Sequence, residues 1–255
     1  MNIRTDLAVE AREMYVGQNK DTSGITVKET KKGDILIAEV EITDKATAKK
    51  INKPVGKYTT IESESFKLLS PDFLVESSYV LKDELEKIKE EKEYMPSHLD
   101  NDIIPVSAIS PGVLGITGME TNDIISAIAK KTNPDLIIVI DALASSSPKR
   151  ISTTIQITDT GINPGSGISN NRKEISKKSL GTPVIAIGVP TVVDLLSIAK
   201  YIYPDMKSTE IGKDFFVTPK EIDKLIENMS KIIANGINLS LHKNIDLEYI
   251  EAFIN

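Results

Sequence analysis

Hydrophobic and polar residues alternate along the first part of the chain. Residues 25–43 read ITVKETKKGDILIAEVEIT, with alternating positions on both sides of Lys32-Gly33-Asp34. A period of two is typical of half-buried strands, and a Gly-containing turn between two such runs predicts a β-hairpin. The stretch GKYTTIES from Gly56 predicts another strand, and TDKATAKKINK between them predicts a short helix. We therefore expect a small β-rich subregion over residues 24–65.

A helical pattern begins after this subregion. Ser70 and Pro71 have the chemistry of a helix start, with Ser as N-cap and Pro in the first turn. The following FLVESSYVLKDELEKIKEEKE predicts a surface helix that ends in a solvated charge run. Its inner side is formed by Phe73, Leu74, Val80, Leu81, Leu85 and Ile88.

The middle of the chain alternates between strand and helix patterns. Residues 103–144 predict a strand, a Gly-rich turn, a helix over Asp123–Lys131 and a second strand. Leu136–Ile140 is apolar throughout, so we expect this strand to be buried, central and parallel to its neighbours. TPVIAIGVPTVVDLLSIAKYI repeats the strand–loop–helix pattern. The sequence thus predicts an α/β fold with a mainly parallel sheet flanked by helices, in a single domain over residues 1–255.

The last helix has a strong start signal. Thr218 is the expected cap, Pro219 the first residue and Glu221 the capping-box partner, and Gly236 is expected to end the helix. Asp194, near the start of the preceding helical pattern, is expected to be a capping or exposed residue.

Composition narrows the possible chemistry. The 255 residues include no Cys and only two His, and the formal net charge is −6. Disulfides, thiol nucleophiles and Cys-based metal sites are therefore excluded. His98 is expected at the surface, and His242 is expected to be satisfied or solvated. We expect no metal and no cofactor. The negative charge argues against broad nucleic-acid binding, and the absence of a long apolar run argues against a membrane partner, which fits a cytoplasmic protein.

Asp141 is the first candidate for chemistry, because it directly follows the apolar strand Leu136–Ile140. Ligands of open parallel sheets bind beyond the carboxyl ends of the strands, where residues 141–144, 159–167 and 188–191 are expected to meet. Asp141 could act there as a general base. It could equally cap the amides of the Ser residues that follow it. The pattern alone leaves both interpretations open.

Acid–base chemistry with carboxylates needs a second acid. Two carboxylates that share a proton titrate apart and can supply both roles. Asp159 and Glu120, each beside a Gly-rich turn, are the candidates. In DTGINPGSG, the residues Gly165, Ser166 and Gly167 could present backbone N–H groups to a substrate carbonyl or to an anion. The loop lacks the Lys-Ser/Thr ending of a P-loop, so a small-molecule enzyme with a bound anion is the weaker hypothesis.

Several long blocks occur in order along the chain. They are IRTDLAVEA, PVSAISPGVLGITGMETNDII, PDLIIVIDALA, TIQITDTGINPGSG, GTPVIAIGVPTVVD and FFVTPKEID. Together they resemble the germination protease family of spore-forming bacteria, and the resemblance covers most of the chain.

The resemblance implies a fold, an activity and a mode of regulation. Members are similar in fold to the hydrogenase-maturation endopeptidases, and they are cytoplasmic endopeptidases that degrade small acid-soluble spore proteins. They are made as zymogens, lose a short N-terminal piece and assemble as homotetramers. An atypical aspartic mechanism with two Asp residues is proposed for them, and one of these corresponds to Asp141. The activation cleavage in RTDLA corresponds to the bond between Asp6 and Leu7.

The chain also departs from the family pattern. The family's other catalytic Asp lies in a loop after a strand that ends in Gly-Leu-Gly-Asn, and neither that strand nor its loop is found here. Asp72 is better explained as a helix-start residue. The chain is thus expected to skip a strand, a loop and a helix after about Glu93, and to be shortened again near Met206–Asp214. The His of the family's GIHPGSG loop is Asn163.

Loss of a strand would leave its neighbours with unpaired edges. Two hypotheses follow. The chain is an endopeptidase with Asp141 and Asp159 as catalytic carboxylates and Glu120 and Gly165 in the substrate cleft. Alternatively, it is a catalytically silent relative that binds spore proteins or sibling subunits without cleaving them.

Overall fold

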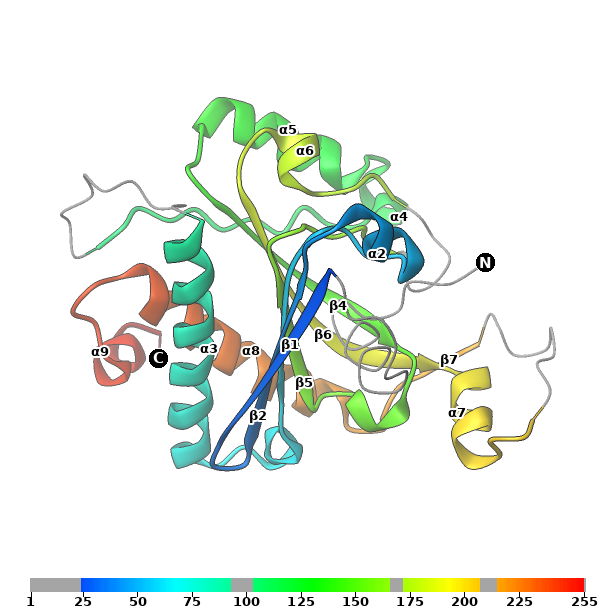
Figure 1. Ribbon diagram of the computed structural model, residues 1–255. Helices are drawn as coiled ribbons and strands as arrows, with labels where there is room; N and C mark the ends of the chain where they lie inside the picture. Colours follow the sequence, from blue (N-terminus) through cyan, green and yellow to red (C-terminus); the bar gives the residue numbers. More distant parts are fainter. Residues whose placement is uncertain (1–23, 93–102, 166–171, 207–214, 255) are drawn as a thin grey trace.

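One seven-stranded sheet organises the protein (Figure 1). The computed structural model describes residues 24–92, 103–165, 172–206 and 215–254. The strands are β1 (Ile25–Lys32), β2 (Ile35–Ile42), β3 (Gly56–Glu62), β4 (Ile137–Ser145), β5 (Thr154–Thr158), β6 (Val184–Asp194) and β7 (Phe216–Val217). Their order is β1-β2-β3-β5-β6-β4, and β7 pairs with β6. The helices are α2 (Lys45–Lys50), α3 (Pro71–Glu91), α4 (Leu114–Thr117), α5 (Thr121–Thr132), α6 (Lys177–Leu180), α7 (Leu195–Ile202), α8 (Ile222–Leu241) and α9 (Leu247–Ile254), and the 3₁₀ turns are η1 (Glu64–Leu68) and η2 (Pro148–Arg150).

The predicted β-rich N-terminal portion is confirmed. β1 and β2 form an antiparallel hairpin in the register Ile25↔Ile42, with Gly33 at φ 53° in the turn. A residue with a side chain is disfavoured at this φ, which explains the Gly. β3 pairs with β2 on one side and with β5 on the other, so the hairpin belongs to the same sheet as the rest of the molecule.

The α/β class is confirmed, but the parallel part of the sheet is smaller than expected. Only β4 and β6 pair in parallel, and the other described pairs are antiparallel. The short connection between β4 and β5, which contains η2, explains the difference. A parallel neighbour needs a crossover of about a dozen residues or more, whereas a short connection reverses the strand direction.

Strand β4 is parallel, as predicted, but it lies at the edge of the described sheet and not at its centre. Its residues Ile137–Val139 are only half-buried, and Ile140 is 56 % exposed. No described strand pairs with its outer side. The expectation that a missing strand would leave an open edge therefore applies to β4.

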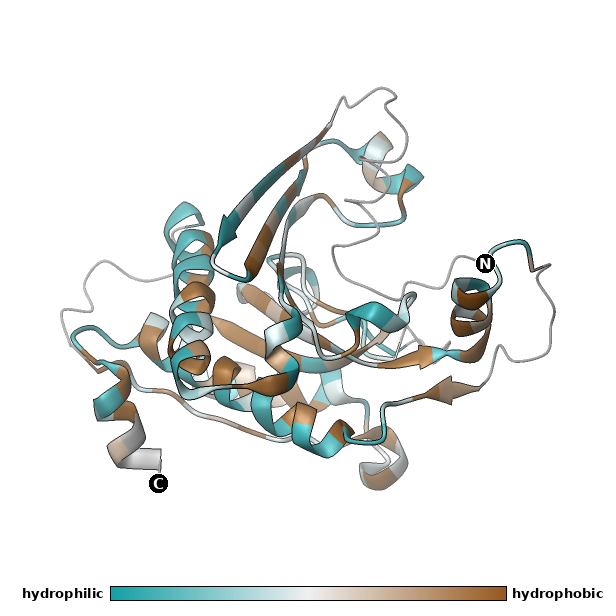
Figure 2. Cartoon of the chain, turned by 90° about the horizontal axis from the view of Figure 1, so that it is seen from below, coloured by the Kyte–Doolittle hydropathy of each residue, from teal (hydrophilic) through white to brown (hydrophobic). Residues whose placement is uncertain are grey.

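Helices cover both faces of the sheet. α3 and α8 pack together over one face, and their apolar side chains join Ile155, Ile157, Ile185 and Ile187 in the main core. Figure 2 shows the apolar stripe of α3 turned inward and its polar side turned outward. α5 and α6 lie beyond the opposite face of β4 and β6, where Ile125 and Leu180 pack on a smaller apolar cluster.

Two predicted helix signals have different outcomes. Ser70 caps α3 as expected, because its hydroxyl accepts a hydrogen bond from the amide of Phe73. The capping box expected before α8 does not form, since the hydroxyl of Thr218 donates to the carbonyl of Thr191. α8 also continues through Gly236 instead of ending there. A Cβ at this position would lie 2.7 Å from Leu81 Cδ2, so this Gly permits the close approach of α3 and α8.

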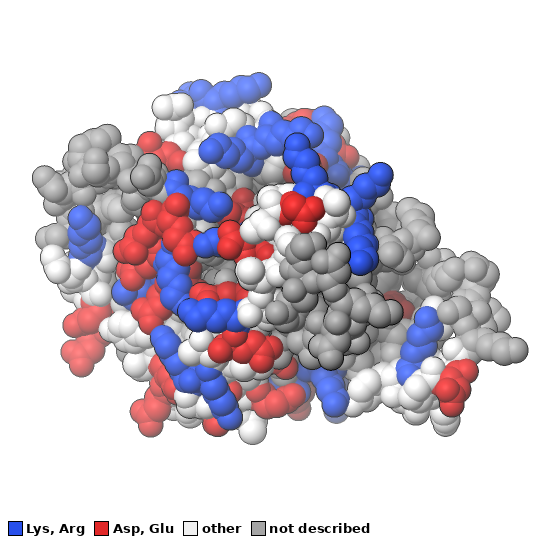
Figure 3. Space-filling view, viewed as in Figure 1, with Lys and Arg blue, Asp and Glu red and all other residues white. Residues whose placement is uncertain are grey.

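Charged side chains of both signs intermingle over α3 and the hairpin on the face in Figure 3. Ion pairs of Lys32 with Asp83 and of Lys87 with Glu39 connect the hairpin to α3. Such exposed pairs contribute little stability individually. Among the described residues, no helix is long and apolar enough to cross a membrane.

Candidate functional site

A cavity of about 1490 Å³ extends along β4. One wall is formed by Leu136–Ala144, and the other walls are formed by the segment Ile104–Gly115, by α5 and by the loop 160–165. The segment has no helix or strand before α4 begins at Leu114. The unpaired side of an edge strand is thus part of the cavity wall.

Asp141 lies in the middle of this wall. Side chains alternate between the two faces of a strand, so Asp141 shares a face with Val139 and Leu143. Both neighbours belong to the apolar cluster on the α5 and α6 side of the sheet. The carboxyl group is consequently half-buried among aliphatic side chains.

The hydrogen bonds of β4 place the carboxylate at its open edge. The amide of Ile137 donates to Pro183, which precedes β6, at 3.0 Å. In a parallel pair alternate residues face the partner strand, so the amides of Ile138, Ile140 and Ala142 point away from β6. The amide of Ala142 donates to Asp141 Oδ1 at 2.9 Å. The carboxylate of Asp141 therefore occupies the position where a further strand would bind.

Burial raises the pKa of Asp141 because the charged form loses water, and the hydrogen bond from the Ala142 amide opposes this only in part. A carboxyl group with a raised pKa can hold a proton closer to neutral pH than an ordinary Asp, which suits acid–base chemistry.

Asp159 lies outside this cavity, and both oxygens of its carboxylate have partners in the protein. Its Oδ1 accepts a hydrogen bond from the amide of Lys57 at 2.8 Å, and its Oδ2 pairs with Lys92 at 2.9 Å. The side chain is 5 % exposed and is not part of the cavity wall. Asp159 connects the end of β5 to the start of β3 and to the C-terminal end of α3. The structure does not bring it together with Asp141, because β6 lies between β5 and β4, and Asp141 is level through Gly188 with Gln156, three residues before Asp159.

The loop after β5 nevertheless returns to the cavity. Ile162 packs in the same apolar cluster as Leu143, and Gly165 lines the cavity. Gly161 turns the chain at φ 79°, and a Cβ there would lie 2.2 Å from the carbonyl oxygen of Ile175. Residues of all three segments that were expected to meet, namely 141–144, 160–165 and Thr191, line this one cavity, but 141–144 and 188–191 lie within β4 and β6 and only 160–165 is a loop.

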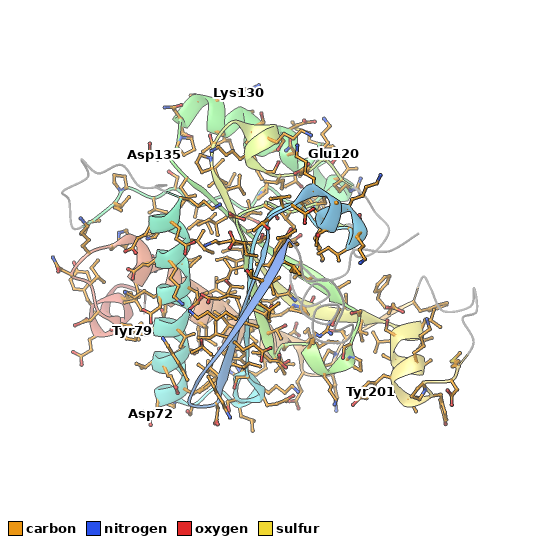
Figure 4. All side chains as sticks on the ribbon, viewed as in Figure 1. Asp72, Tyr79, Glu120, Lys130, Asp135 and Tyr201 are labelled. Carbon is orange, nitrogen blue, oxygen red and sulfur yellow. The ribbon has the colours of Figure 1, made fainter. Side chains whose placement is uncertain are left out.

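Glu120, like Gly165, is a predicted cleft residue that lines the same cavity as Asp141. It immediately precedes α5, and its Oε1 lies 3.6 Å from a guanidinium nitrogen of Arg172, which also lines the cavity. Figure 4 shows Glu120 and Asp135 at opposite ends of α5, and Asp72 at the distant foot of α3. Asp72 is therefore the helix-start residue that the sequence predicts.

Other predicted site residues lie outside the described residues. These are Ser166 and Gly167 in the Gly-rich loop, Asp6 and Leu7 at the expected activation site, and His98. In the described part of the chain, no group of three His, Asp or Glu side chains is arranged to hold a metal ion.

Sequence reasoning missed the wall opposite β4. The run Ile104–Ser110 was expected to be a strand, but it forms neither strand nor helix. Pro105 and Pro111 lack amide hydrogens and provided a signal against a paired strand. His242, expected to be satisfied or solvated, accepts a hydrogen bond on Nδ1 from the amide of Ile104 at 3.2 Å and so fixes one end of this wall.

Comparison with known proteins agrees with the resemblance in the sequence. The sequence model of a family described as "Germination protease" matches residues 5–95, 88–203 and 205–254. The chain is 38% identical to a germination protease of Clostridium perfringens over 323 aligned positions, which cover 100% of this chain and 99% of the relative. It is 37% identical to one from Clostridium tetani (100% of each chain) and 35% identical to one from Bacillus cereus (99% and 97%).

The same comparison locates the shortened parts of the chain. Because 323 aligned positions accommodate a chain of 255 residues, at least 68 positions of the Clostridium perfringens relative have no counterpart here. The family match is interrupted at residues 88–95 and between 203 and 205, close to the two places where the sequence departs from the family pattern. With matches that extend over nearly its whole length, this chain belongs to the germination protease family.

Proposed function

We propose that this protein is an endopeptidase that degrades small acid-soluble spore proteins during germination, with Asp141 as a catalytic carboxylate. The observation that carries the proposal is the position of Asp141, a half-buried carboxyl group with a raised pKa on the wall of a large cavity. Membership of the germination protease family supports the protease activity. The proposal extends to a zymogen cleaved between Asp6 and Leu7, a homotetramer and a location in the spore core, which follow from the family resemblance.

Hydrolysis of a peptide bond needs one group that takes a proton from water and one that donates a proton to the departing amine. Two carboxyl groups can perform both steps when one is ionised and the other is protonated. Because burial raises its pKa, Asp141 is suited to the protonated role. It would donate its proton to the amine while the ionised group activates the water.

We assign the second role to Glu120 in preference to Asp159. Glu120 lines the same cavity, and its contact with Arg172 at 3.6 Å is longer than a hydrogen bond. Asp159 has both carboxylate oxygens engaged by Lys57 and Lys92 and does not line the cavity. The Gly165 amide region could bind the substrate carbonyl that develops negative charge.

The test uses purified protein with a small acid-soluble spore protein, with and without the residues through Asp6, and detects fragments by mass spectrometry. Asp141→Asn keeps the shape and removes the titrating group, so we expect cleavage to fall about 10²-fold or more. Glu120→Gln should have an effect of similar size. Asp159→Asn is the matched control, which should reduce stability but leave cleavage near the wild-type rate at a temperature where the protein is folded.

The outcomes separate three cases. Cleavage by Asp141→Asn at the wild-type rate would refute the catalytic assignment. Loss of cleavage in Asp159→Asn at full folding, with Glu120→Gln active, would return the second role to Asp159. Intact substrate with the folded wild-type protein would support the alternative function, a silent relative that binds spore proteins without cleaving them. One observation favours this alternative: within the described residues, the only hydrogen bond to the Asp141 carboxylate comes from the amide of its own neighbour, Ala142.

A further inference from the structure

Gly188 lies in the middle of the long strand β6, where a Gly needs an explanation. It is buried, and it pairs with Asp141 of β4 on one side and with Gln156 of β5 on the other. A Gly inside a strand weakens the strand, and it is typical of a bulge or of the close approach of another group. The register of β4 and β6 is regular at this level, and the φ of Gly188 is not in the positive range that favours Gly. A close approach remains as the reason.

The group that approaches Gly188 is the side chain of Leu143. A Cβ at position 188 would lie 2.5 Å from Leu143 Cδ1 and 2.7 Å from Leu143 Cγ. Carbon atoms that are not bonded to each other prefer separations of about 3.5–4.0 Å, so any residue other than Gly would displace this side chain. Leu143 itself is level with Pro190, and its isobutyl group therefore leans back along β6 to rest on the main chain of Gly188.

This contact covers one side of Asp141. Gly188 is level with Asp141, and the side chains of level residues in neighbouring strands point to the same face. Leu143 thus takes the place beside the carboxyl group that a side chain at 188 would occupy. It is 8 % exposed and belongs to the same apolar cluster as Ile162 and Ala186. The cover on the β6 side of the carboxyl group is therefore aliphatic, whereas its other side faces the open edge of β4 and the cavity.

Charged groups of the cavity wall do not account for the ionisation of Asp141. Besides Asp141, the described part of the wall carries Glu120, Asp135, Glu174 and Arg172. Burial is the main cause of the raised pKa of Asp141, a backbone hydrogen bond opposes it, and none of these four groups is among the causes. The side chains that keep water from the carboxyl group are consequently the ones to identify.

We propose that Leu143, seated on Gly188, is a positioning residue for Asp141: its isobutyl group shields the carboxyl group from water on the β6 side and keeps it turned toward the open edge of β4. Gly188 belongs to the same unit, because it provides the space in which Leu143 lies. The inference rests on the proposed function for the catalytic use of the Asp141 proton, but the shielding can be measured without catalysis.

The experiment follows the ionisation of Asp141 directly. The carboxyl carbons of the Asp residues are observed by ¹³C NMR across a pH titration of the full chain, and the signal that is absent in Asp141→Asn belongs to Asp141. Leu143→Ala should lower the pKa of Asp141 by about one unit toward its ordinary value of 3.8, because water then reaches the β6 side. In a protein that cleaves, the pH above which cleavage declines should fall by the same amount, since the protonated form is the acid.

Val184→Ala is the matched control. Val184 belongs to the same apolar cluster as Leu143, but it is level with Ile137, about 13 Å along β6 from Gly188. The substitution should lower the urea midpoint of unfolding and leave the pKa of Asp141 unchanged. An equal fall of this pKa in Val184→Ala and Leu143→Ala would show that any loosening of the cluster has the effect, and it would overturn the specific role of Leu143.

A double substitution tests the contact itself. Gly188→Ala alone should lower the urea midpoint, because the new methyl group overlaps with Leu143. In Gly188→Ala combined with Leu143→Ala, the methyl group fits the space that Leu143 leaves, so the loss should be smaller than the sum of the two single losses. The pKa of Asp141 should also be higher in the double variant than in Leu143→Ala. Far-UV circular dichroism checks folding, and Leu143→Val, with a smaller shift in the same direction, replaces Leu143→Ala if that variant is unfolded.

The results distinguish this inference from the proposed function. A lowered pKa of Asp141 in Leu143→Ala, with spore protein left intact by the wild-type protein, would support the shielding and refute catalysis. Cleavage that depends on Asp141, with the same pKa in the wild-type protein and in folded Leu143→Ala, would support catalysis and overturn the shielding. Strictly additive effects of the substitutions at 143 and 188 would also overturn it.

Discussion

Replacement of Asp141 should distinguish a desolvated catalytic carboxylate from a residue that only caps a turn. Asn has nearly the same shape and can still accept the hydrogen bond from the amide of Ala142, but it cannot ionise. Ala removes both the charge and the acceptor. Comparison of Asp141→Asn with Asp141→Ala therefore separates the effect of the charge from the effect of the hydrogen bond.

The structure gives the sign of the charge effect. Burial raises the pKa of Asp141 in the folded protein above its ordinary value of 3.8. As pH rises above this value, the carboxyl group of the unfolded chain ionises while that of the folded chain retains its proton. The free energy of unfolding of the wild-type protein should consequently decline through this pH window, and the decline ends above the raised pKa. Asp141→Asn should not show this contribution, so it gains stability relative to the wild-type protein between pH 4 and pH 8.

The hydrogen bond gives the magnitude for the second comparison. One bond of 2.9 Å from the Ala142 amide is lost in Asp141→Ala and kept in Asp141→Asn. A single hydrogen bond contributes about 0.5–1.5 kcal/mol, so Asp141→Ala should be less stable than Asp141→Asn by about 1 kcal/mol at every pH.

Urea unfolding at pH 4, 6 and 8, followed by circular dichroism, measures both effects. A residue that only caps would make the wild-type protein the most stable of the three at pH 8, because its ionised carboxylate is the best acceptor. If Asp141→Asn is less stable than the wild-type protein at pH 8, the desolvation argument is wrong, and with it the main physical support for a catalytic Asp141.

Two further predictions concern the helices around the cavity. Gly236→Ala should destabilise the protein by about 1 kcal/mol in urea unfolding, because the new Cβ would clash with Leu81 at 2.7 Å, and this cost of about 1–3 kcal/mol outweighs the gain in helix propensity. Gly115→Ala is the control that should not destabilise the protein, because its Cβ would meet no atom within 4 Å. A stabilised Gly236→Ala variant would show that α3 and α8 can separate without cost. Burial and the nearby Lys89 hold the pKa of His242 below its ordinary value of 6.5. The free energy of unfolding should therefore fall as pH decreases below 6.5. Protonation of the imidazole also removes the acceptor for the hydrogen bond from the Ile104 amide. Exchange of that amide, corrected for its intrinsic rate, should accelerate on acidification in the wild-type protein but not in His242→Ala, and equal pH dependence in both would refute the role of His242.

Local patterns in the sequence predicted the structural features that depend mainly on residues close to one another in the chain. The hairpin around Gly33 and the cap at Ser70 depend on neighbouring residues, and the structure confirms them. The strand before Asp141 is also present, but β4 continues through Asp141 to Ser145, so Asp141 lies within the strand and not beyond its carboxyl end as expected. Gly236 shows the limit of such reasoning. Its local signal is that of a helix end, but the contact that explains it comes from Leu81 on a helix far away in the sequence. No local pattern contains that information.

The candidate site shows the same division. The position of Asp141 at the end of an apolar run was visible in the sequence, whereas the direction of β5 was not. Asp159 was predicted as a candidate partner because it lies beside a Gly-rich turn, in a segment expected to meet Asp141 at the carboxyl ends of parallel strands. The strand is antiparallel and separated from β4 by β6, so its end leads Asp159 away from the level of Asp141, and Asp159 pairs with Lys92. Strand direction depends on long-range pairing, which the periodicity of a strand does not specify.

The open edge also determines where the groups that complete the site must come from. A charged residue directed toward an exposed strand edge discourages pairing with another chain, so Asp141 limits unspecific strand addition while it supplies a carboxyl group. The other carboxylates in the cavity wall are Glu120, Asp135 and Glu174, and none of them lies on a strand. Among the described residues of the wall, the carboxylate that we propose as the second acid, Glu120, is therefore supplied by the start of α5 and not by the sheet.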